Sequence, residues 1–252
     1  MLHERVGLWY ARAMEFIPVK TRILTPPQDD LYTVLDRSLP VLQEEDVVIV
    51  SSKVVAIHEG RCLSIDGSDK EALVKSETDF TIPRDYYRLP LTVTRHTFLG
   101  AAGVDESNGG GYYILLPEAP FASAHNLHAH LKEKFKLTNL GVIITDSHSG
   151  PFRYGATGVS LAWWGIEPLE DHRGRTDLFG RKIQYERSNL VDGLAAGATV
   201  VMGEVDEGVP VVIARGVPRL VCTEKNTRET LLVPYREDLF RVLYEKFLPP
   251  TL

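Results

Sequence analysis

The stretch "GVIITDSHSGPFRYG", residues 141–155, starts with apolar, mostly β-branched residues and continues into acidic, hydroxyl and glycine-rich sequence. A short apolar run of this kind predicts a buried strand, and the polar residues after it predict a loop. The predicted strand ends at Asp146, which is followed by Ser147. Two interpretations of Asp146 are open: its side chain turns the chain, or its carboxylate holds a ligand.

Strands and helices are predicted to mix irregularly on both sides of this stretch. The expected strands are residues 14–24, 46–61, 89–100, 140–146, 155–172 and the end of 189–216. The expected helices are residues 29–42, residues 121–135 with Ser123 as the cap, and the start of 189–216. Neither a regular βαβ pattern nor an internal repeat of fixed period is visible. The fold class that follows is α+β (mixed α/β).

Composition limits the class of function. A chain of 252 residues with 44% hydrophobic content can bury a full core. The formal charge of −6 argues against a nucleic-acid partner, because phosphate backbones are held by clustered lysine and arginine. No apolar run approaches the roughly 20 residues that cross a bilayer. Cys62 and Cys222 are too isolated for a thiolate metal site. We expect a cytoplasmic protein with small-molecule substrates, no nucleic acid and no membrane partner.

Oxygen-bearing side chains follow predicted strands or helices at three places. These places hold Asp105 with Asn108, Asp146 with Ser147, and Glu204 with Asp206. Magnesium and manganese prefer carboxylate and hydroxyl oxygens, so the composition of the three places suits a divalent metal. The competing interpretation is that aspartate and asparagine supply turns.

Other patterns carry less information. His125 and His128 share a helical face but no cysteine joins them, so a solvated helix face is preferred over a zinc site. The standard phosphate-binding loops, G-x-x-x-x-G-K-[ST] and a strand-linked G-x-G-x-x-G, are missing from the sequence. A nucleotide would therefore bind through a less common scaffold.

Seven ordered blocks, from "MEFIPVKT" to "LAAGATVVMGEVDEGVPVVIARG", resemble the coenzyme F420-0:L-glutamate ligase (gamma-glutamyl ligase) family. The most distinctive are "RTDLFGR" and the later "VVMGE" with "GVPVVIARG". The resemblance implies a gamma-glutamyl ligase-like fold, with mixed sheets and flanking helices, over residues 14–252. Two discontinuous subdomains remain an alternative. Residues 1–13 are expected to be an N-terminal extension, because a second methionine opens the strand-like segment at position 14.

The resemblance also implies an activity. Family members are GTP-dependent ligases that form an amide between L-glutamate and the carboxyl of a phospholactyl-deazaflavin, coenzyme F420-0, through an acyl phosphate. It implies Mg²⁺ or Mn²⁺, GTP as a substrate, K⁺ as a further candidate cation, and a homodimer. Acidic metal ligands suit this chemistry, because a metal offsets the repulsion between two anionic substrates.

The family's functional residues transfer to matching positions of this chain. The implied metal ligands are Asp105, Asp146, Ser147 and Glu204. The implied nucleotide contacts are Phe16, Ile17, Pro18, Val19, Ser51, Ser52, Lys53, Asn108, Met202, Gly203, Val205, Asp206, Glu207, Gly208 and Val209.

The chain departs from the family pattern at several positions. Ile57 stands where the family usually has a lysine proposed to meet nucleotide phosphate, a loss that Lys53 or His58 could compensate. Further departures are His148 with Ser149, and the bulky pair Trp163 and Trp164, which either reshape the acceptor pocket or fill the core. Two alternatives therefore stay open. One is a catalytically altered member that binds metal or a phosphorylated ligand, and the other is an amide ligase for a different carboxylate.

Overall fold

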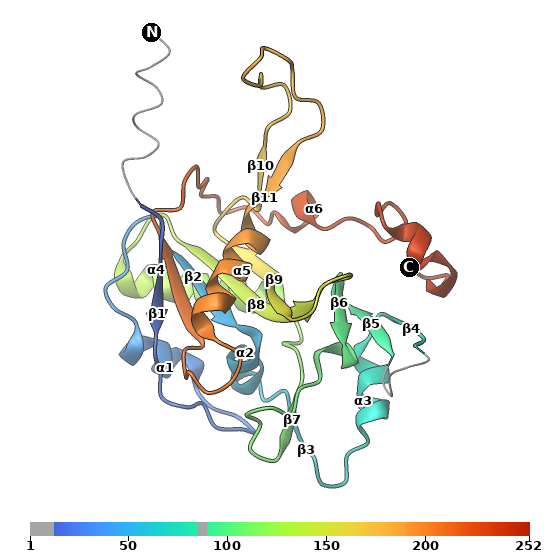
Figure 1. Ribbon diagram of the computed structural model, residues 1–252. Coiled ribbons are helices and arrows are strands. Elements are labelled where there is room, and N and C mark those ends of the chain that lie inside the picture. The colour runs from blue at the N-terminus through green and yellow to red at the C-terminus, as the bar shows by residue number, and fades with distance from the viewer. Residues whose placement is uncertain (1–12, 85–89) are drawn as a thin grey trace.

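The computed structural model describes residues 13–84 and 90–252 (Figure 1). Apart from Ala13, the predicted N-terminal extension lies outside the described residues. The chain contains both helices and mixed sheets, which confirms the predicted α+β class. Within the described part of the chain, every helix is too short or too polar to cross a membrane.

The central sheet has five strands in the order β1-β12-β2-β8-β9. These are β1 (Glu15–Val19), β12 (Val211–Arg215), β2 (Val47–Ser51), β8 (Gly141–Ser149) and β9 (Ala156–Trp164). Strands β2 and β8 pair in parallel, and the other neighbours pair antiparallel. The continuous apolar sequence of β2 suits a central strand whose two faces are both covered.

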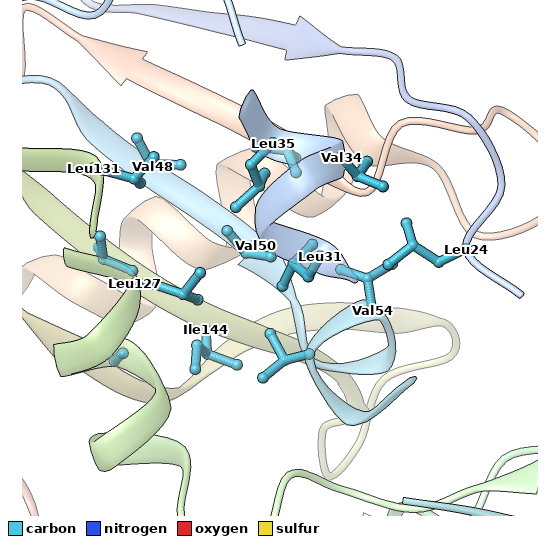
Figure 2. Packing of buried hydrophobic residues seen from close by; sticks show 14 of the residues in the cluster. Leu24, Leu31, Val34, Leu35, Val48, Val50, Val54, Leu127, Leu131 and Ile144 are labelled. Carbon is cyan, nitrogen blue, oxygen red and sulfur yellow. The ribbon is translucent and has the colours of Figure 1, made fainter. Parts of the chain in front are cut away.

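Helices cover both faces of this sheet. Helices α1 (Leu31–Ser38), α2 (Ser52–His58) and α4 (Pro120–Phe135) pack on one face, and α5 (Leu190–Met202) packs on the other. Because side chains alternate along a strand, Val48 and Val50 enter the first core, where they meet Leu31, Leu35 and Leu127 (Figure 2). Their neighbours in β2 enter the second core, beneath α5.

A second lobe is inserted between α2 and α4. It contains β3 (Cys62–Ser64), α3 (Lys70–Glu77), β4 (Phe80–Ile82), β5 (Leu91–Thr94), β6 (Thr97–Gly100), a 3-10 turn (Ala101–Gly103) and β7 (Tyr112–Ile114). Strands β4, β5 and β6 form their own sheet, and β3 pairs with β7. The C-terminal segment, with α6 (Arg228–Leu231), packs Tyr244 against Phe80 and Val93 of this lobe. A hairpin of β10 (Leu169–Asp171) and β11 (Arg187–Asn189) projects from the central sheet (Figure 1).

Four sequence predictions of local structure were wrong, the first three as follows. Strand β8 continues through Ser149, because β9 pairs with it as far as Ala156, so Asp146 lies within the strand and not at its end. The strand predicted over residues 46–61 ends at Ser51, and the rest is mostly helix α2. Helix α4 begins at Pro120, whose fixed backbone suits a first helical turn, and Ser123 instead donates its hydroxyl hydrogen bond to Glu59.

The predicted strand over residues 89–100 is a hairpin rather than a single strand. Arg95 and His96 both have positive φ, 51° and 61°, and these residues turn β5 back into β6. A sequence without glycine or asparagine at this turn gave no signal for it.

Candidate functional site

The strand register brings several of the predicted site segments to one edge of the central sheet. Val19, Val211, Val50 and Ile144 lie in a row across four neighbouring strands. Because β12 is antiparallel to both β1 and β2, the strands β1, β2 and β8 all run in the same direction. Their C-terminal ends therefore meet at one edge, beside the start of β12.

Lys53 contacts the second lobe at this edge. Its Nζ lies 2.7 Å from Oδ2 of Asp105, and it donates hydrogen bonds of 3.0 Å to both the carbonyl oxygen and the hydroxyl of Ser107. Ser107 in turn donates from its backbone N–H and its hydroxyl to the Asp105 carboxylate. Burial alone would raise the pKa of Asp105, but the bonds from Lys53 and Ser107 outweigh it and lower that pKa.

Asp146 adds a second carboxylate. Burial raises the pKa of its carboxyl to about 6, and the negative charge of Asp105 adds to the rise. The Ser147 N–H and the Ser52 hydroxyl bond to the Asp146 carboxylate and act in the opposite direction, as does the charge of Lys53. Two carboxylates that repel each other at a sheet edge make a place where a cation is electrostatically favoured.

The loop between α5 and β12 closes one side of the site. Asn108 of the second lobe donates a 2.8 Å hydrogen bond from Nδ2 to the carbonyl of Val205. The loop is fixed to the sheet edge by bonds from Thr21 N–H to the Gly208 carbonyl and from Ser51 N–H to the Pro210 carbonyl. Residues far apart in sequence thus surround one region.

Three other predicted residues differ in their placement. Phe16 is at the opposite end of β1, paired with Ala214, and its ring packs against Gly197 of α5. Glu204 is exposed in the loop between α5 and β12, next to Val205, whose carbonyl accepts the bond from Asn108. Ser147 pairs with Gly158, which contacts α5, so alternation places the Ser147 side chain on the sheet face opposite to Asp146.

The sequence interpretation missed one residue of the site, Ser107. Its signal was present in "DES", because an aspartate followed two residues later by serine commonly forms a turn closed by the aspartate side chain. Asp105 fulfils that turn role and also faces Lys53, so the turn and ligand interpretations are compatible.

Most residues that depart from the family pattern lie in the core, away from the two carboxylates. Ile57 is 3% exposed in the core between α2 and its neighbours, whereas Lys53 of the same helix reaches the site. The His58 side chain bonds to the start of α1 and lies away from Lys53. Trp163 is buried, and Trp164 pairs with Val142 at the far end of β8, so both tryptophans fill core rather than line the site. His148 lies in β8 two residues beyond Asp146, on the same face of the strand.

The other histidines of α4 lie away from the two carboxylates or contact residues nearby. His125 packs on Trp164, and His130 contacts Asp36. His128 is buried, and among the described residues its Nε2 has no hydrogen-bond partner. Each arginine singled out by its sequence neighbours has a local contact: Arg215 with buried Asp46, Arg173 with Asp171, and Arg153 with its own neighbour's carbonyl.

The donor set at the edge fits a hard divalent cation. Asp105 and Asp146 supply carboxylate oxygens, and Ser52 and Ser107 supply hydroxyls. Magnesium commonly binds through one or two carboxylates and completes its shell with water and substrate phosphate. Within residues 13–84 and 90–252, no three His, Cys, Asp or Glu side chains form a group that could hold a metal, so Glu204 does not complete a cluster of three acids with the two aspartates.

Comparison with known proteins gives one consistent family. The sequence model of F420-0:Gamma-glutamyl ligase matches residues 18–216. The coenzyme F420:L-glutamate ligase of Methanopyrus kandleri is 36% identical over 249 residues, covering 90% of this chain and 97% of that relative. The ligase of the same name from Methanococcus maripaludis is 32% identical, covering 96% and 100%. The Methanocaldococcus jannaschii ligase is 43% identical over a shorter match, 60% of each chain. The chain therefore belongs to the F420-0:gamma-glutamyl ligase family.

Proposed function

We propose that this protein is a GTP- and metal-dependent ligase that joins L-glutamate to the carboxyl of coenzyme F420-0 through an amide bond. The relatives that match it over most of its length are named for such a ligation. The observation that carries the proposal is the meeting of Lys53, Asp105 and Asp146 at the sheet edge, beside the loop that Asn108 contacts.

The reaction needs an anionic nucleotide and an anionic acceptor in one place. The γ-phosphoryl group of GTP passes to the acceptor carboxylate, giving GDP and an acyl phosphate. The amino group of glutamate then attacks the acyl carbon, the C–O bond to phosphate breaks, and inorganic phosphate leaves with the amine losing a proton. Carboxylate activation thus requires two negative groups to approach each other, and cations at the site lower that cost.

The residues of this chain have distinct tasks in that reaction. Asp105 and Asp146 would hold Mg²⁺ or Mn²⁺, which neutralises the phosphate oxygens when bound. Lys53 supplies a cation of the protein itself. Asn108 keeps the loop over residues 203–210 against the second lobe, where the loop backbone can meet the nucleotide.

Three further features belong to the proposal. The enzyme acts in the cytoplasm, as a homodimer, with K⁺ as a candidate additional cation. The cytoplasmic location follows from the sequence composition, and the homodimer and K⁺ follow from the family likeness.

Phosphate release is the direct test. Purified protein with GTP, MgCl₂, L-glutamate and coenzyme F420-0 should release phosphate only when both glutamate and acceptor are present. Mass spectrometry should find the acceptor extended by a glutamyl residue. Omitting the acceptor is the control for simple GTP hydrolysis. Acceptor-independent release with no amide product would refute the ligase assignment.

A further inference from the structure

Lys53 reaches an all-oxygen site on the other lobe. Its Nζ contacts a carboxylate oxygen of Asp105, the hydroxyl of Ser107 and the carbonyl of Ser107, at 2.7, 3.0 and 3.0 Å. Carboxylate, hydroxyl and carbonyl oxygens are the ligands that hard metal cations select. The ammonium thus occupies a position that suits a cation.

An ammonium and a divalent metal compete for this position. Magnesium binds oxygen at about 2.0–2.1 Å. A metal on Oδ2 of Asp105 would therefore share one oxygen with the ammonium, and two cations at contact distance repel strongly. One of the two must move. The Lys53 side chain can do so, because it has a flexible four-carbon stem and is 27% exposed.

We propose that Lys53 is an internal counter-ion that occupies Asp105 in the metal-free protein and is displaced by the divalent metal, after which its ammonium is free to face the nucleotide phosphates. The inference rests on the proposed function, and it assigns Lys53 a positioning role for both ligands.

The displacement of Lys53 from Asp105 couples the binding of the metal to the binding of the nucleotide. Metal binding alone separates Lys53 from Asp105 and deprives the ammonium of its carboxylate partner, so metal binding is weakened. A nucleotide that offers phosphate oxygens to the displaced ammonium removes that cost. By thermodynamic reciprocity, metal must then strengthen nucleotide binding by the same factor.

The first test measures Mn²⁺ affinity without nucleotide, by electron paramagnetic resonance of free Mn²⁺, for wild type and Lys53→Met. The variant should bind Mn²⁺ about 5- to 10-fold more tightly, because the competing ammonium is gone. Lys53→Arg keeps the charge and should resemble wild type. Lys70→Met is the matched control, since Lys70 lies 3.6 Å from Glu106, the neighbour of Asp105. The control should change the affinity less than about 2-fold.

The second test measures GTP affinity at saturating Mn²⁺ by calorimetry. Here Lys53→Met should bind about 10-fold more weakly, because a phosphate contact is lost. Opposite changes in two affinities are not expected from a merely structural effect. Circular dichroism melts check that each variant is folded.

Equal or weaker Mn²⁺ binding by Lys53→Met overturns the inference, as does equal tightening by Lys70→Met or a wild type that binds no Mn²⁺. A different result would refute the ligase proposal. A protein that shows the two opposite affinity changes but makes no amide would keep the counter-ion role and lose the ligase assignment.

Discussion

Replacing Asp146 with asparagine removes a partly buried carboxyl whose pKa is raised to about 6. The corresponding carboxyl in the unfolded chain has a pKa near 3.8. The folded protein therefore binds this proton more tightly than the unfolded chain does. The resulting stabilisation is complete below the unfolded pKa and is lost as the pH rises through the folded pKa.

The structure sets the size of the effect. The difference between about 6 and 3.8 is about 2 pKa units, and at about 1.4 kcal/mol per unit it corresponds to about 3 kcal/mol above neutral pH. At about pH 4.5 the raised pKa of Asp146 has lowered the unfolding free energy by only about 1 kcal/mol. Relative to wild type, Asp146→Asn should therefore gain about 2 kcal/mol between about pH 4.5 and pH 7.5 in metal-free buffer.

Urea unfolding in EDTA at the two pH values measures this gain. Asp105→Asn is the matched control: because the pKa of Asp105 is lowered, the stabilisation from its charge is almost complete by about pH 4.5, and its removal should destabilise the protein about equally at the two pH values. A stability difference between Asp146→Asn and wild type that is independent of pH, or that decreases toward pH 7.5, would refute the assignment of Asp146 as a destabilising carboxylate.

Three further predictions use the same site and core. Added Mg²⁺ should raise the melting temperature of wild type more at about pH 7.5 than at about pH 5, because protons compete with metal for Asp146. In calorimetric scans, the melting temperature of Asp146→Asn should rise much less on addition of Mg²⁺. Asn108→Ala breaks the bond to the Val205 carbonyl and should raise the KM for GTP several-fold with a smaller change in kcat, measured by phosphate release. Arg215→Met leaves buried Asp46 without its cation and should lower the unfolding free energy by about 3–5 kcal/mol in a urea titration.

Much of the secondary structure could be predicted because its patterns are local. The apolar run before Asp146 predicted β8, and the segment over residues 189–216 was predicted as a helix and a last strand, which are α5 and β12. Helix α2 could not be predicted in the same way. The apolar sequence of β2 continues almost without a break into Val54, Val55 and Ile57, and periodicity cannot separate a short buried helix from a strand.

The membership of the site was partly predictable, and its geometry was not. Acids at the ends of elements identified Asp105 and Asp146 as candidates. Which of them share a site depends on long-range register: β2 must pair with β8, and the second lobe must return Asp105 to Lys53. Glu204 illustrates the limit, since a suitable residue type after a helix does not fix where its side chain points within the loop.

The position of the second lobe does not depend on the contact that we expect the metal to break. The Lys53–Asp105 pair is partly exposed, and such pairs contribute about 0–1 kcal/mol. Stronger contacts hold together the two segments of chain that connect the lobes. Arg61 donates to the Leu116 carbonyl and contacts Glu77 at 2.6 Å, where both side chains are largely buried. Lys53 can therefore exchange partners while Arg61 keeps its contacts to Leu116 and Glu77, so ligand exchange at this edge requires a side-chain movement rather than the opening of the two lobes.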